Sequence, residues 1–255
     1  MKLEKIERAK QHLSELKSEI SSFLSSQPYK AAVKRDPKTK QIIYYCSGIE
    51  EVPEKIALIA GDVIQNLRSA LDHLAYKLFL INSSDGTLNR DIYFPIAEDL
   101  ARSDSKKSRQ TSGMSQNAKD LIDSIKPYKG GNDRLWQINE LNNTDKHRLL
   151  VTVGASLDRV DLGTSISVEL QKLVPGVEIP KIPAFFKTAV LSPLKVGDTL
   201  LIHPPDKNEI PETKFEFGII IDEPNVLKTE LLVDALQSMI ETVDAVIISF
   251  DPLLS

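Results

Sequence analysis

The sequence predicts an α+β protein, mainly a helical bundle with a small antiparallel β-sheet before the last helix. Long stretches within residues 1–150 repeat apolar residues at the helical period of 3.6. Short β-rich runs separated by proline and glycine turns fill residues 160–222. Because no linker is evident, we expect one α+β domain over residues 1–255, with a helical core from 1–150 and 224–250.

Two long helices and a hairpin are predicted in the first third of the chain. Residues 2–26 carry a helical apolar stripe, and Pro28 ends that helix. KAAVKR and QIIYYC flank the turn DPKTK, which predicts a β-hairpin. Pro53 suits the first turn of a second helix over residues 54–82. Its apolar stripe consists of Ile56, Ile59, Val63, Leu67, Ala70, Leu74 and Leu78.

The middle of the chain is more polar. Residues 99–117 are rich in serine and lysine and predict a mobile surface loop. A short helix is predicted over 116–126, and a fourth helix over roughly 133–150. The segment 102–134 leans basic, which fits either a solvated surface or a basic loop that meets phosphates.

The last third changes character. SISVEL, FFKTAVL, DTLLIH and KFEFGIII are rich in β-branched and aromatic residues, so we expect strands of one small antiparallel sheet. Residues 225–249 return to a helical apolar spacing and predict the last helix.

Composition narrows the class of protein. The formal net charge of -4 over 255 residues gives no global attraction to nucleic acid or to an anionic membrane. Cys46 is the only cysteine, so no internal disulfide is possible, and a reducing compartment fits. The charged N-terminus is no signal peptide, and no apolar stretch has the length of a membrane span. We therefore expect a cytoplasmic protein.

Two polar strings stand out on the predicted helices. In GDVIQNLRSALDHL, four polar residues are spaced four, three and four apart and form one stripe: Asp62, Asn66, Ser69 and His73. Arg68 and Asp72 form a neighbouring stripe. In LNNTDKHR, the polar residues that we single out are Asn143, Asp145, Lys146, His147 and Arg148.

Each string contains a histidine, His73 or His147, that lies close in sequence to a carboxylate and an arginine. A carboxylate raises the pKa of a histidine and burial lowers it, so such a site can supply a general acid or base. We take Arg68, Asp72, His73 and His147 as candidate catalytic residues. The substrate-binding candidates are the other polar residues singled out above: Asp62, Asn66, Ser69, Asn143, Asp145, Lys146 and Arg148. The alternative is structural: buried polar residues on facing helices fix their pairing, and Thr144 or Asp145 could cap a second helix.

The string Arg68-Ser69-Ala70-Leu71-Asp72-His73 matches the R-x4-H form of a known motif. In this the chain resembles the HEPN superfamily of helical proteins, many of which are metal-independent ribonucleases. The resemblance implies that Arg68 contacts the scissile phosphate of RNA and that His73 moves protons. It also implies a homodimer, because HEPN sites usually form where two protomers meet. NLRSALDHL and LNNTDKHR are further similar to an uncharacterised family of bacterial proteins, which implies that both strings belong together.

Three functions compete at this point. The first is a HEPN-like ribonuclease that acts on RNA phosphodiesters without a cofactor. The second is a non-enzymatic ligand-binding or protein-interaction module with a structural polar cluster. The third is a metal-dependent hydrolase using Asp62, His73, Asp145 and His147, although no familiar metal-binding spacing is present, and we therefore expect no metal or other cofactor.

Overall fold

The computed structural model describes residues 4–83, 91–148, 153–180, 183–188, 191–203, 210 and 213–254. The side chains of residues 145–148, 164, 165, 168, 169 and 172 lie outside this description. The fold is mainly helical α+β with small antiparallel sheets, which confirms the predicted fold class.

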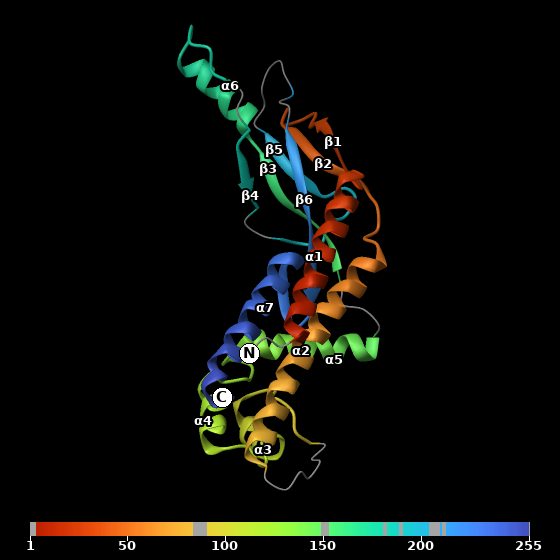
Figure 1. The fold of residues 1–255 in the computed structure, drawn as a ribbon. Coiled ribbons are helices and arrows are strands. Elements are labelled where there is room, and N and C mark those ends of the chain that lie inside the picture. The colour runs from red at the N-terminus through yellow and green to blue at the C-terminus, as the bar shows by residue number, and fades with distance from the viewer. Residues whose placement is uncertain are drawn as a thin grey trace.

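Two long helices form the spine of the helical part. Helix α1 (Glu4–Ser25) and helix α2 (Glu54–Asn82) run antiparallel and side by side (Figure 1). Helix α7 (Leu232–Ser249) packs against both, and a 3₁₀ turn, η1 (Asp251–Leu253), follows it. Helix α5 (Asp133–Arg148) crosses this group and contacts α2 and α7. Their apolar stripes meet in one large core, since burial of such stripes stabilises a helical bundle far more than intrinsic helix propensity does.

The strands form two small sheets instead of the single sheet expected. One sheet has the order β1-β2-β5, formed by Tyr29–Arg35, Ile42–Ile49 and Thr199–His203. The other has the order β4-β3-β6-β7, formed by Phe185–Lys187, Val153–Asp161, Lys214–Glu223 and Leu227–Leu231. Ile42, Tyr44, Cys46 and Leu200 of the first sheet pack with Phe215 and Phe217 of the second. The predicted hairpin is confirmed as β1 and β2.

Three local predictions were wrong. The expected loop at 99–117 contains helix α3 (Leu100–Gln110), whose N-terminus is capped by the Asp99 side chain accepting from the Arg102 N–H at 2.9 Å. SISVEL belongs to helix α6 (Gly163–Leu173) and is not a strand. The last helix begins at Leu232, because β7 occupies most of the preceding residues. Helix α4 (Gln116–Ile125) lies as expected.

Candidate functional site

Arg68 occupies a nearly buried position on α2, with 11% of its side chain exposed. Its Nη2 lies 3.0 Å from Asp72 Oδ1, one helical turn further on, and donates a hydrogen bond to the Phe94 carbonyl at 3.1 Å. The Phe94 N–H in turn donates to Asp72 Oδ1 at 3.1 Å. The pair therefore holds both polar groups of the Phe94 backbone, which positions the segment that leads into α3.

The other terminal nitrogen of Arg68 has no such partner. Nη1 is buried and forms no hydrogen bond to any residue that the structure describes. Burial lowers the pKa of Arg68, while Asp72 and Tyr93 oppose that shift. A buried N–H of a charged group without an acceptor is costly, so Nη1 is a candidate donor to an anionic ligand.

Lys106 brings a second cation to the same place. It is half-buried on α3, and its ammonium group forms no ion pair within the described part of the chain. Burial lowers its pKa first, and the nearby Arg68 and Arg109 guanidinium groups lower it further. Glu140 of α5 acts in the opposite direction. We call Arg68 of α2 and Lys106 and Arg109 of α3 the cationic cluster.

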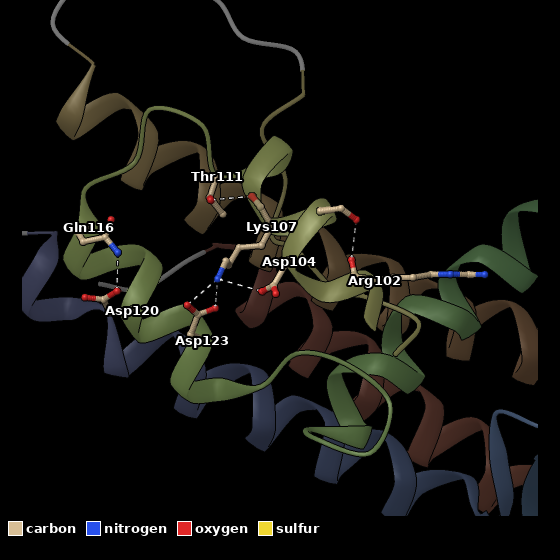
Figure 2. A network of polar contacts seen from close by, with 8 residues as sticks. Arg102, Asp104, Lys107, Thr111, Gln116, Asp120 and Asp123 are labelled. Atoms are coloured by element: carbon tan, nitrogen blue, oxygen red, sulfur yellow. Dashed lines mark hydrogen bonds and ion pairs between the residues drawn. The ribbon is translucent and has the colours of Figure 1, made fainter. Parts of the chain in front are cut away.

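Lys107, the next residue in the sequence, differs from Lys106 in its ion pairs. Figure 2 shows it pointing toward α4, where its Nζ lies 2.8 Å from both carboxylate oxygens of Asp123. Asp104 lies 3.7 Å away on the same helix. These carboxylates raise the pKa of Lys107, whereas that of Lys106 is lowered. Lys107 is therefore held in ion pairs, whereas no ion pair of Lys106 is found within the described residues.

The predicted polar stripe of α2 lies on its more exposed side. Asp62 and His73 are exposed, while Asn66 and Ser69 are half-buried. Asn66 Nδ2 donates to the Asp62 carbonyl at 2.8 Å, so this amide is engaged within its own helix. Of the α2 candidates, the structure brings Arg68 and Asp72 together and leaves His73 on the surface beside them.

Helix α5 continues through the second string. No new helix starts at Thr144 or Asp145, so the predicted alternative of a capped second helix was wrong. Asn139 and Asn142 are buried and Asn143 is exposed. Asn139 Nδ2 donates to Glu140 Oε1 at 3.0 Å. The predictions for the four residues that follow Thr144 concern side chains outside the described residues: Asp145, Lys146, His147 and Arg148.

Lys106 and Glu140 were missing from the predicted site, although the sequence held a signal for one of them. The basic bias of segment 102–134 includes Lys106 and Arg109, but a loop prediction gave no reason to place them beside Arg68. Glu140 carried no signal, since a single glutamate on an amphipathic helix is ordinary. The proximity of these residues to Arg68 depends on where α3 and α5 lie relative to α2, which no local pattern encodes.

The metal-site alternative fails on geometry. Asp62 and His73 are eleven residues apart on one continuous helix, which corresponds to about 16 Å along its axis. Two side chains that far apart cannot bind one ion. Within the described residues, no group of three or more histidine, cysteine or acidic side chains is placed to bind a metal.

Comparisons leave the chain without an assigned family. No protein family, no curated protein and no solved structure matches it. None of the described helices is long and apolar enough to cross a membrane. The functional argument therefore rests on the cationic cluster and its neighbours.

Proposed function

We propose that the protein is a non-enzymatic ligand-binding module that recognises a phosphate group at the cationic cluster. The observation that carries this proposal is the buried, unpartnered Nη1 of Arg68, together with Lys106, whose charge is disfavoured by burial and by Arg68. Guanidinium and ammonium groups together are the usual protein partners of phosphate, the first through directed hydrogen bonds and the second as a point charge.

The charge balance of the site supports an anionic ligand. Arg68 pairs with Asp72, and among the charged groups that act on Lys106 only Glu140 is acidic, whereas Arg68 and Arg109 are cations. Asp72 is already engaged by Arg68 and Phe94, and Glu140 accepts from Asn139. An arriving phosphate would supply acceptors for Nη1 and a counter-charge for Lys106, which removes two unfavourable features of the unliganded protein.

Calorimetric titration with inorganic phosphate and with adenosine 5′-monophosphate tests this proposal. We expect saturable binding that Lys106→Gln weakens about tenfold, which is about 1.4 kcal/mol. Lys107→Gln is the matched control, because it removes the same charge from the same helix but from a lysine bound to Asp123. Equal losses in both variants, or binding that neither variant weakens, would contradict a site at Lys106.

A second candidate is the ribonuclease that the HEPN resemblance implies. The unpartnered Arg68 Nη1 and the exposed His73 on the same helix favour it. Five residues correspond to about 140° around a helix, so Arg68 and His73 of one protomer point to different sides. Joint action on one phosphate would then need His73 from a second protomer, in line with the homodimer that the resemblance implies.

Cleavage of labelled RNA in the presence of EDTA decides between the two candidates. The ribonuclease predicts cleavage that His73→Ala abolishes and that depends on protein concentration through dimer formation. The binding module predicts phosphate binding with no cleavage, and unchanged binding in His73→Ala. Cleavage that survives His73→Ala would exclude the proposed role of that histidine.

A further inference from the structure

A cavity lies far from the cationic cluster, between the two sheets and the end of α1. Its volume is about 1010 Å³, at the upper end of the range for ligand sites. Residues Tyr29–Ala31 of β1 line one side and residues Lys214–Phe217 of β6 line the other. Asp158 of β3 also contributes to the lining. Figure 1 shows β1 near the part of β6 that is remote from the helices.

Both strands present a free edge in this region. β1 is the outer strand of its sheet and pairs only with β2. β6 pairs with β3 from Lys214 to Ile221, but its pairing with β7 begins only at Ile220. Within the described chain, residues 214–218 therefore have no neighbouring strand on the β7 side. Unpaired strand edges carry N–H and C=O groups that readily accept another strand.

Two residues lining the cavity also have buried oxygen atoms with no partner. Asp158 Oδ1 and Tyr29 Oη form no hydrogen bond to any described residue. The other Asp158 oxygen, Oδ2, lies 3.5 Å from Arg159 Nε, a distant contact with a half-exposed side chain. Burial raises the pKa of Tyr29 to about 12, so its hydroxyl group stays protonated at neutral pH. The cavity thus offers an unsatisfied carboxylate acceptor beside aromatic rings.

We propose that this cavity binds an extended segment of another polypeptide, which pairs with the free edge of β6 and places a basic side chain at Asp158. Main-chain hydrogen bonds would supply affinity and the Asp158 carboxylate would supply selectivity, as in other cases of strand addition. Lys30, Lys214 and Glu216 are exposed at the rim. Such charges on an edge discourage nonspecific strand pairing, so selectivity for the occupant would depend on Asp158.

Fluorescence anisotropy with labelled peptides tests this inference independently of the phosphate site. The probes are hexapeptides of alternating valine and threonine with a central arginine, a central glutamate or a central proline. We expect the arginine peptide to bind at least tenfold more tightly than the other two. We also expect Asp158→Asn to reduce that preference at least fivefold, while Asp120→Asn on α4 leaves it unchanged.

Amide hydrogen exchange provides the readout for strand pairing and guards against misfolded variants. Bound arginine peptide should slow exchange of amides within residues 214–218 in the wild-type protein. No binding of the arginine peptide at 1 mM, equal binding of the arginine and glutamate peptides, or protection only elsewhere would overturn the proposal. A dimer of the protein that excludes the peptide would also overturn it, because the edge would then belong to a second copy.

Discussion

The charge of Lys106 should favour phosphate binding but should destabilise the protein when no phosphate is bound. The lowered pKa means that the folded protein disfavours the charged ammonium group relative to the unfolded chain. Lys106→Met should therefore stabilise the unliganded protein at pH 7, by less than about 1 kcal/mol because the side chain keeps partial solvent contact. Urea denaturation without phosphate measures this gain.

The pH dependence of that difference has a definite sign. Between the lowered pKa of folded Lys106 and its ordinary value of 10.5, the unfolded chain binds more protons than the folded protein. Wild type should therefore gain stability relative to Lys106→Met as pH rises toward 10.5, and the advantage of the variant should shrink. If the difference in unfolding free energy between wild type and Lys106→Met stays constant with pH, folding does not disfavour the charged form of Lys106.

Arg68 and Asp72 should matter for stability as well as binding. Arg68→Met removes the bond to the Phe94 carbonyl and leaves Asp72 in place as a partly buried carboxylate, so we expect a loss of about 2–4 kcal/mol. Asp72→Asn keeps an acceptor for the Phe94 N–H and should lose less. In the double variant the two losses should be less than additive, and strict additivity in urea denaturation would show that the residues act separately.

At the scale of elements, α3 is the helix on which the cationic cluster depends. Asp99→Ala removes its N-terminal cap and should destabilise α3 by about 1 kcal/mol. This destabilisation of α3 should also lower the affinity for phosphate, although Asp99 lies outside the cationic cluster. Ser115→Ala, which uncaps α4 instead, should leave affinity unchanged. Hydrogen exchange of residues 100–110 and calorimetry on both variants measure the two effects.

Helix α2, which buries a long apolar stripe, was predicted well from the sequence, and helix α3, which has none, was not. α2 matched its predicted range of 54–82 because its apolar stripe is long and continuous. α3 has no such stripe, since Gln110 is its only buried residue, so composition alone predicted a loop. SISVEL alternates like a strand, yet it lies within helix α6. The i, i+4 spacing predicted the pair Arg68–Asp72. No feature of the sequence predicted that Lys106 lies near Arg68.

At the scale of the whole molecule, distant segments share their sheets and core. β5 completes the sheet begun by β1 and β2, more than 150 residues earlier in the chain, and α7 packs on α1, α2 and α5. Because no part closes its core alone, we expect one cooperative unfolding transition. Trp136 fluorescence on α5 and far-ultraviolet circular dichroism should give the same midpoint. Separate midpoints would indicate independently folding helical and β parts.

The most direct measurement observes the Arg68 guanidinium group during binding. In protein labelled with ¹⁵N at arginine side chains, titration with inorganic phosphate should shift the Arg68 resonances saturably, with the affinity found by calorimetry. Lys106→Gln should move that titration to about tenfold higher phosphate, and Lys107→Gln should not. Arg68 resonances that stay unchanged while surface arginines respond would show that the phosphate binds elsewhere or not at all.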